Sequence, residues 1–406
     1  GWNTVALDTA GDAAAIADDI ALVTGAGYMP PWPANDAGLT FRHDGSLTDE
    51  ELSAIADWAR EGGGLDVAPD TPLVADPGRL RAIERDVVVT GEPYAGSLDR
   101  PDDYRCQVYE VGDPSTERWI RAVSFEPDQT EVVHHAVLSV ATADQRENVA
   151  AESGADGKPG WSCVGPAGVD DTTQFWAWAP GTPPYELPDD TGVRLAPGEF
   201  VVIQIHYHYD HEAPLDESAL IVDLASEQEL EDGGGALVPV TSELYLAPAE
   251  LPCTADQSGP LCERGAVIAA FLDDYGIFGA TIPDGLLLMC GLSLDDYLAD
   301  TDGVTTTHCD HRIANPGRIV KLWPHMHEFG ASYRMILNPG TPEERLLLEI
   351  PAWSFEWQLD YLPADDIVVD SDDTIRVECT YDRSLVYEEE PRYVTWGVGT
   401  GDEMCY

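Results

Sequence analysis

Apolar residues at helical spacing come first in the chain. Residues 12–23 are rich in Ala, Ile and Leu, and residues 46–60 form a second helical pattern with a hydroxyl cap and early acidic residues. Glu61 and the glycines after it end this second pattern. A proline-rich turn at residues 28–33 joins the two predicted helices, and residues 66–77, with three prolines and three aspartates, are typical of a linker. Residues 1–75 are therefore predicted to be a small helical segment with a linker.

From about residue 80 onward, short apolar runs alternate with turns rich in Pro, Gly and Asp. The predicted strands cover residues 85–90, 104–111, 119–125, 132–140, 200–209, 236–246, 318–322, 332–337, 374–381 and 392–397. This alternation of short apolar runs and turns is typical of antiparallel β-sandwiches. The acidic, glycine-ended stretch 229–235 is the best candidate for a hinge. We predict a mainly β protein with two antiparallel, jelly-roll-like β-sandwich domains, over residues 76–232 and 233–406.

The charge balance limits the partners of this chain. It carries 75 acidic against 21 basic residues, for a formal net charge of −54. Such a surface repels nucleic acid and anionic membranes, and its scattered carboxylates suit salt-rich surroundings. No apolar run reaches the roughly 18–20 residues that a membrane span needs. The opening residues do not resemble a signal peptide, and we expect the N-terminus to be a processed or incomplete end.

The eight cysteines indicate an oxidising compartment. No C-x-x-C motif occurs; Cys253 and Cys262 bracket one short loop, and Cys290 and Cys309 bracket another. Cys379 and Cys405 lie at the ends of a probable strand pair. Such spacings favour disulfides over the alternative of thiolate metal ligands. We therefore expect a secreted, periplasmic or cell-surface protein.

The histidines are grouped unevenly along the predicted strands. The groups are His134 with His135, His206 with His208, and His325 with His327. Because residues i and i+2 of a strand share a face, each H-x-H can offer two imidazoles to one ion. The adjacent pair could bind one ion only if its strand is irregular or if the two rings use different nitrogens. A single histidine in a strand is more often a hydrogen-bonded core or edge residue, but three such groups favour metal binding. We expect His308 and His311 to lie in loops.

A methionine near the end of the chain narrows the choice of metal. Imidazole suits zinc, copper, iron or nickel, so the histidines alone do not select the ion. Met404 lies in the run Gly401-Asp402-Glu403-Met404-Cys405. A methionine is usually a core residue, but a thioether beside an H-x-H pair would favour Cu(I) over zinc.

The order of these motifs resembles a known family. His-His, then His-Tyr, then His-x-His and Asp-Glu-Met-Cys is similar to the type II copper, ascorbate-dependent monooxygenases, which include peptidylglycine α-hydroxylating monooxygenase, dopamine β-monooxygenase and bacterial relatives. The resemblance covers roughly residues 79–406. It extends to Trp176-Ala177-Trp178-Ala179-Pro180 with Pro183-Pro184, to Gln204-Ile205-His206-Tyr207, and to Arg376-Val377-Glu378-Cys379.

The resemblance implies two coppers per chain and an oxidoreductase that hydroxylates a C–H bond with O2. It gives His134, His135 and His206 to an electron-storing site on the first sandwich. It gives His325, His327 and Met404 to the catalytic site on the second, with His208 as an outer-shell residue or spare ligand. It also implies a Cys379–Cys405 disulfide that holds Met404 near the H-x-H strand and a Cys106–Cys163 disulfide that braces the first domain. Ascorbate would be the electron donor.

One departure from the family bears on the substrate. The peptide-hydroxylating branch has a basic residue just before the H-x-H strand, whereas this chain has Leu322-Trp323-Pro324, with Lys321 further back. We therefore expect a small, non-peptide substrate with an aliphatic or benzylic C–H bond. The family usually continues through a final strand after the methionine, so we expect the C-terminus at Tyr406 to be incomplete.

The N-terminal segment has a second resemblance. Met29-Pro30-Pro31-Trp32 and the helix at 46–60 resemble the distal half of a small c-type cytochrome that precedes bacterial members, with Met29 as an axial haem ligand. The attachment motif C-x-x-C-H is absent from this sequence. Haem c is therefore expected only if that motif lies outside this chain, and haem would then replace ascorbate as reductant. The alternative is a helical packing segment in which Met29 is a core residue.

Two hypotheses of other classes stay open. One is an extracellular copper-binding or electron-transfer protein without hydroxylase activity. The other is a structural extracellular β protein with incidental metal sites.

Overall fold

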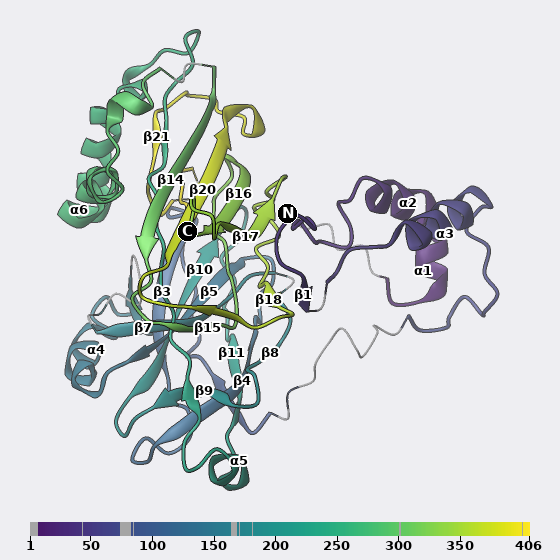
Figure 1. The fold of residues 1–406 in the computed structure, drawn as a ribbon, viewed down its shortest axis with the longest axis horizontal. Helices are drawn as coiled ribbons and strands as arrows, with labels where there is room; N and C mark the ends of the chain where they lie inside the picture. The colour runs from purple at the N-terminus through teal and green to yellow at the C-terminus, as the bar shows by residue number, and fades with distance from the viewer. Residues whose placement is uncertain are drawn as a thin grey trace.

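The prediction of a mainly β chain with antiparallel sheets is confirmed by a computed structural model (Figure 1). The structure describes residues 7–42, 44–73, 83, 85–163, 169, 171–180, 182–299, 302–399 and 401–406. The named strand pairs are antiparallel except β12 with β9. Part of the predicted linker, from residue 74 to 77, lies outside the described residues.

Three helices form the N-terminal segment, which stands to one side of the β-rich body in Figure 1. They are α1 (Ala10–Ala15), α2 (Ala17–Gly25) and α3 (Asp49–Arg60). The single helix predicted at 12–23 is thus two helices, because Ile16 leaves helical geometry at φ −124° and ψ 30°. Thr48 and Glu51 form a capping box at the start of α3, and Gly62 and Gly63 follow its end with φ of +88° and +66°. The second predicted helix and its stop are therefore confirmed.

Two sheets enclose the first apolar core. The five-stranded sheet has the order β6 (Trp161–Ser162), β3 (Asp102–Tyr109), β10 (Phe200–His208), β5 (Val133–Ala141), β7 (Thr172–Trp178). The six-stranded sheet has the order β12 (Val238–Pro239), β9 (Thr191–Leu195), β4 (Arg118–Glu126), β11 (Ala219–Leu224), β2 (Val87–Thr90), and β8 (Tyr185–Glu186) pairs with β4. Alternate residues of both sheets, such as Ile203 of β10 and Leu220 of β11, are buried in one cluster. The five strands predicted before residue 210 are confirmed within a few residues.

A second core lies under the remaining strands. The four-stranded sheet has the order β14 (Val304–Arg312), β20 (Thr374–Asp382), β16 (Gly330–Leu337), β17 (Arg345–Ile350). Three strand pairs flank it: β15 (Gly317–Ile319) with β19 (Ile367–Val369), β13 (Glu250–Leu251) with β21 (Val394–Thr395), and β1 (Phe41–Arg42) with β18 (Leu362–Pro363). Trp32 of the N-terminal segment packs on Tyr361 of this core, with ring centroids 5.2 Å apart.

Several predicted elements of the second half were wrong in detail. The strand predicted at 236–246 is a connection in which only Val238–Pro239 pairs, with β9. His308 and His311 lie in β14 and not in loops, and His311 Nε2 lies 2.8 Å from the carbonyl of Leu246. The predicted hinge is largely a short helix, α5 (Glu227–Asp232), followed by three glycines.

Two further helices lie in stretches where the sequence predicted no element. They are α4 (Arg146–Glu152) and α6 (Arg264–Met289). Helix α6 is broken at Gly276, where φ is +70° and ψ is −170°. No helix in the described part of the chain combines the length and the apolar content that a bilayer crossing requires.

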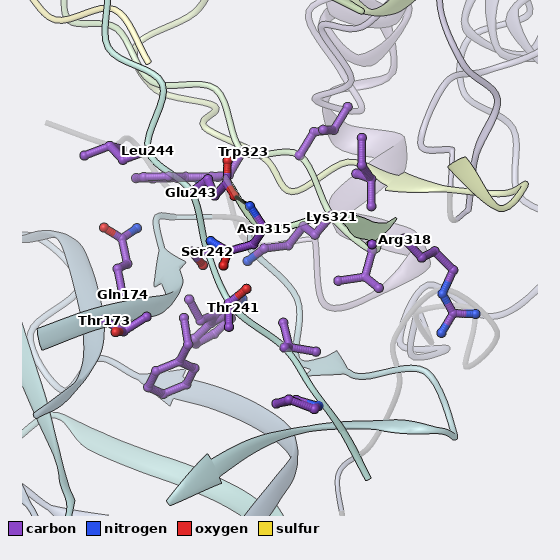
Figure 2. A pocket seen from close by; sticks show the side chains of 18 of the residues that line it. Thr173, Gln174, Thr241, Ser242, Glu243, Leu244, Asn315, Arg318, Lys321 and Trp323 are labelled. Atoms are coloured by element: carbon purple, nitrogen blue, oxygen red, sulfur yellow. Dashed lines mark hydrogen bonds between the residues drawn. The ribbon is translucent and has the colours of Figure 1, made fainter. Parts of the chain in front are cut away.

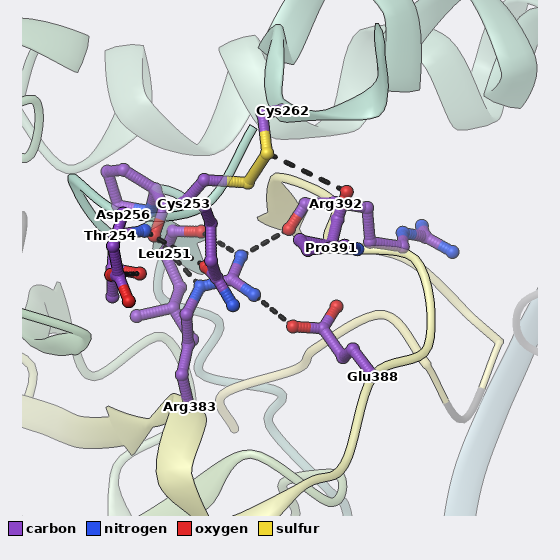
Figure 3. The surroundings of a disulfide bond; sticks show 11 residues. Leu251, Cys253, Thr254, Asp256, Cys262, Arg383, Glu388, Pro391 and Arg392 are labelled. Carbon is purple, nitrogen blue, oxygen red and sulfur yellow. Dashed lines mark hydrogen bonds and ion pairs between the residues drawn. A yellow bond between two sulfur atoms is a disulfide. The ribbon is translucent and has the colours of Figure 1, made fainter. Parts of the chain in front are cut away.

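All eight cysteines are paired, as expected, in four disulfides: Cys106–Cys163, Cys253–Cys262, Cys290–Cys309 and Cys379–Cys405. Figure 3 shows the loop closed by Cys253–Cys262 beside the buried guanidinium of Arg383. Arg383 donates to the carbonyls of Pro252 at 2.9 Å and Leu251 at 3.1 Å and pairs with Glu388, which fastens this loop to the end of β20. Four disulfides are typical of proteins in an oxidising, extracellular compartment.

Candidate metal centre

Two neighbouring central strands, β5 and β10, carry the first set of histidines. His135 pairs with His206, but the next pair joins Val133 to Tyr207, so His134 has no partner in the register. An extra residue of this kind is a β-bulge, which turns side chains that a regular strand would point to opposite faces. The bulge allows both adjacent histidines to meet His206, and it is the irregularity that the sequence alone left open.

The three imidazoles of this first set converge through their Nδ1 atoms. The Nδ1 of His135 lies 3.2 Å from that of His134 and 3.4 Å from that of His206. Two nitrogens bound to one ion at about 2.0–2.1 Å lie roughly 3.3–3.6 Å apart in trigonal or tetrahedral geometry. One ligand atom from each ring lies within 4.8 Å of the others. The set therefore fits a single metal ion bound by three imidazoles.

A carboxylate fixes the tautomer of His206. Asp102 Oδ1 accepts the Nε2–H of His206 at 3.0 Å, which leaves Nδ1 with its lone pair toward the cluster. The same oxygen lies 2.9 Å from His208 Nδ1, and His208 Nε2 lies 3.4 Å from Asp210. Burial would raise the pKa of Asp102, but the hydrogen bonds from both histidines outweigh it and hold that pKa well below its ordinary value. His208 is therefore placed as a partner of Asp102 beside the set.

The second set, His325 and His327, lies between β15 and β16. The Nδ1 of His325 is hydrogen-bonded to the amide oxygen of Gln358, and the Nδ1 of His327 lies 3.1 Å from the carbonyl oxygen of Asp402. Both rings donate from Nδ1 to these oxygens, which leaves Nε2 of His325 as its ligand atom, whereas His327 is also hydrogen-bonded to the backbone of Gly399. The ring centroids are 5.1 Å apart. Hydrogen bonds at Nδ1 therefore orient both rings of this pair, whereas the first set turns its Nδ1 atoms toward one another.

The C-terminal segment of the chain holds the second set in place. His325 and Tyr406 exchange backbone hydrogen bonds of 2.6 and 3.1 Å. The buried carboxyl of Glu403 accepts the backbone N–H of His327 at 3.0 Å and of Phe329 at 2.6 Å. Cys405, two residues after Glu403, is joined to Cys379 of β20 by a disulfide. Met404 therefore lies in a segment that is hydrogen-bonded to the H-x-H residues and to those next to them.

Burial keeps these imidazoles in the neutral form that binds metals. It lowers the pKa of His134 to about 3 and of His327 to about 4. The pKa values of His135 and His325 fall well below the ordinary value for the same reason, and burial also lowers that of His206. A cluster of buried, neutral imidazoles is a ligand set without a proton to displace.

The two sets of histidines touch each other, which the expectation of two separate clusters did not include. The ring centroids of His135 and His325 lie 5.7 Å apart at 75°. Phe355, in a turn between β17 and β18, stacks on His134 at 4.6 Å and meets His327 edge-on at 6.0 Å. The five imidazoles therefore form one continuous cluster, which Phe355 contacts on both sides.

A cleft of about 680 Å³ lies next to this cluster. Figure 2 shows side chains from three stretches around it: β7 on one side, residues 318–323 on the other, and the connection 241–244 between them. Trp323 and Tyr406 line the cleft, and their rings lie 5.4 and 4.7 Å from that of His325. The cleft thus ends on an aromatic wall that backs onto the second set.

The sequence identified the histidines of both sets but not the residues that orient them. Asp102 and Gln358 lie far from the histidine motifs in sequence, and no local pattern marks them. Glu403 was visible beside Met404 in the Asp-Glu-Met-Cys motif, without an assigned role. Met29 follows α2 in the N-terminal segment and is partly buried.

Comparisons with known proteins do not assign this chain to a family. No protein-family model and no curated protein matches the chain. Solved structures with some likeness include vicilin from Corylus avellana (hazelnut), with 9% identity over 73% of this chain and 85% of that chain, at a TM-score of 0.13. A variant of oxalate decarboxylase from Bacillus subtilis has 9% identity over 78% of this chain and 81% of that chain, at a TM-score of 0.11. Scores this low carry no argument about fold or function.

Proposed function

We propose that this chain is a copper-dependent monooxygenase, which hydroxylates an aliphatic or benzylic C–H bond of a small, non-peptide substrate with O2. The observation that carries the proposal is the convergence of the three Nδ1 atoms of His134, His135 and His206, from strands separated by some 70 residues in sequence. A second histidine pair, with each Nδ1 held by an oxygen of the protein, lies against the segment that contains Met404. This is the ligand order of the family that the sequence resembles.

The residues of each set have distinct roles in the proposal. His134, His135 and His206 would hold the electron-storing copper. His325, His327 and Met404 would hold the catalytic copper, because a thioether favours Cu(I) and leaves a position for O2. Bound copper would supply one-electron redox chemistry and O2 activation, so that two electrons, two protons and one O2 give a hydroxylated product and water.

The protein's own part in the reaction is to orient and shield. Asp102 and Gln358 fix the tautomers of His206 and His325, and Glu403 holds the backbone of the H-x-H segment. The rings of His206, His325 and His327 are at most 3% exposed, so bulk water is excluded from most of the cluster.

The non-peptide substrate is supported by the ion pair of Lys321, the basic residue that precedes the H-x-H residues in the sequence. The ammonium of Lys321 lies 3.1 Å from Asp360 and is largely buried, so it is already committed to a carboxylate of the protein. The cleft wall nearest to the second set is aromatic, with Trp323 and Tyr406. An apolar or aromatic substrate without a carboxylate suits this environment.

The wider organisation belongs to the same proposal. Residues 76–232 and 233–406 would be two antiparallel β-sandwich domains, each with one copper, in a secreted, periplasmic or cell-surface protein. Residues 1–75 would be a cytochrome-c-like segment. Ascorbate or a cytochrome would be the electron donor, and Met29 would ligate haem only together with an attachment motif outside this chain.

Stepwise oxidation tests the proposal. The copper-loaded protein is reduced without oxygen, then given O2 with one of a panel of small aromatic and aliphatic compounds. We expect O2 consumption in step with a hydroxylated product for at least one compound, and loss of that product in Met404→Ala. Reoxidation without product across the panel would favour an electron-transfer protein, and failure to bind copper would contradict the proposal.

A further inference from the structure

We infer that the cleft binds a small, neutral aromatic molecule through one polar oxygen, which accepts a hydrogen bond from the hydroxyl of Tyr185 beside the ammonium of Lys321. The inference deepens the proposed function, because it names the class of substrate. It rests on that function only for the statement that the bound molecule is the one hydroxylated. Binding in the cleft does not itself require a metal.

Two donors in the cleft lack acceptors. Among the described residues that line it, only Tyr185 and Lys321 have a buried polar side-chain atom without a hydrogen bond of regular geometry. Burial raises the pKa of Tyr185, so its hydroxyl keeps the proton. Lys321 has three N–H groups, and Oδ1 of Asp360 at 3.1 Å can accept one of them. Because a buried donor without an acceptor is costly, an oxygen that enters here gains bonds that the protein does not supply.

The two donors lie in the same part of the cleft. The Nζ atom of Lys321 lies 5.1 Å from the ring centroid of Tyr185 and 5.8 Å from that of Trp176. Trp176 donates its indole N–H to the other oxygen of Asp360 at 3.0 Å, which fixes the carboxylate against the ammonium. Lys321 faces the cleft in Figure 2. This part of the cleft therefore presents an O–H group, an ammonium and two aromatic rings.

The charges around the cleft favour a neutral ligand. The charged residues that line it are Asp190, Glu243, Arg318 and Lys321. Arg318 lies 2.7 Å from Asp190, and Glu243 accepts the hydroxyl of Tyr245 and the backbone N–H of Ala314 at 3.2 Å. Each charged group thus has a partner within the protein. A charged ligand would have to displace one of these partners, whereas a neutral oxygen can add to the donors that remain.

Aromatic side chains suit the rest of such a molecule. Phe175, Trp323 and Tyr406 line the cleft, and its volume of about 680 Å³ is typical of a small-molecule site. The rings of Trp323 and Tyr406 lie 5.4 and 4.7 Å from that of His325. A molecule that is held by its oxygen at Tyr185 and extends to this wall has its apolar part next to the second set.

Calorimetric titration of the metal-free full chain with two isosteric compounds tests the inference. Acetophenone carries a carbonyl oxygen where α-methylstyrene carries a CH2 group. We expect the wild type to bind acetophenone at least about tenfold more tightly, because the isostere leaves the donors without an acceptor. Benzoate should bind at least about tenfold more weakly than acetophenone, because its charge finds no free cation.

Two matched variants locate the oxygen. Tyr185→Phe should reduce the preference for acetophenone to about threefold or less. Its urea midpoint should match that of the wild type, because the lost hydroxyl makes no hydrogen bond with the described residues. Tyr333→Phe is the control, since Tyr333 of β16 also has a buried hydroxyl without a partner among the described residues but does not line the cleft. It should keep the wild-type preference.

The outcomes separate this inference from the proposed function. Absence of acetophenone binding, equal affinity for the two isosteres, tighter binding of benzoate or an unchanged preference in Tyr185→Phe would each overturn the inference. None of these results would touch the copper proposal, because the titration contains no metal. The expected preference together with no hydroxylation of any compound by the copper-loaded protein would support the cleft site and contradict the proposed function.

Discussion

The hydrogen bond between Asp102 and His206 gives the sharpest single prediction. Asp102→Asn keeps the shape of the side chain but removes the negative charge that accepts the Nε2–H of His206 at 3.0 Å. His206 then has at most a neutral amide oxygen as the acceptor of its Nε2–H, which commits its Nδ1 lone pair to the cluster less strongly than a carboxylate does. Replacing an outer partner of a metal-ligating histidine typically weakens metal binding 10–100-fold, or about 1.4–2.7 kcal/mol. We expect a loss of this size for the ion at the first set.

Competition with a Cu(I) chelator measures this effect, because it reports the affinity of each copper separately when the two differ. Asp210→Asn is the matched control, since Asp210 reaches only the far nitrogen of His208, at 3.4 Å. We expect Asp210→Asn to stay within about twofold of the wild type. If Asp102→Asn binds the first copper as tightly as the wild type, Asp102 does not orient His206, and the Nδ1 geometry has another cause.

Three further predictions follow from single contacts. Met404→Ala should keep at least the first copper, and much of its total metal, but lose turnover. Copper analysis and product formation measure the two effects, and loss of both coppers would contradict the assignment. Cys405→Ser opens a disulfide with a sequence separation of 26 and should cost about 3.5 kcal/mol of unfolding free energy, against about 2.6 for Cys262→Ser with its separation of 9, by urea unfolding. The reverse order would show that loop length does not govern these bonds. The hydrogen bond to Asp102 raises the pKa of His208, so its protonated form stabilises the folded state below pH 6.5, and this contribution is lost as pH rises through the raised pKa. The urea midpoint of metal-free wild type should exceed that of His208→Gln most at acid pH; a difference independent of pH would refute this.

The strands that carry the first histidines were predictable because their apolar residues are continuous. Residues 132–140 and 200–209 are buried on both faces, and such runs indicate central strands. What the pattern could not give is the bulge at His134. A bulge depends on the pairing of β5 with β10, which is a tertiary property, and the sequence left regular and irregular strands as alternatives.

The second half was less predictable because its elements depend on distant partners. The apolar residues at 236–246 have strand-like alternation, yet most of this stretch has no strand partner and lies along the cleft. Helix α6 escaped the sequence analysis because Gly276 and Pro283 interrupt an apolar run with no clear face. Gln358 reaches His325 from a loop 33 residues away, a distance at which no periodicity gives a signal.

X-ray absorption at the copper edge, on the fully reduced protein with two coppers, tests the central claim most directly. Nitrogen donors at both ions and one sulfur donor for every two coppers are predicted, with the sulfur contribution absent from Met404→Ala and retained in His206→Ala. A spectrum without sulfur, or one in which Met404→Ala keeps it, would contradict the assignment of His325, His327 and Met404 as one ligand set.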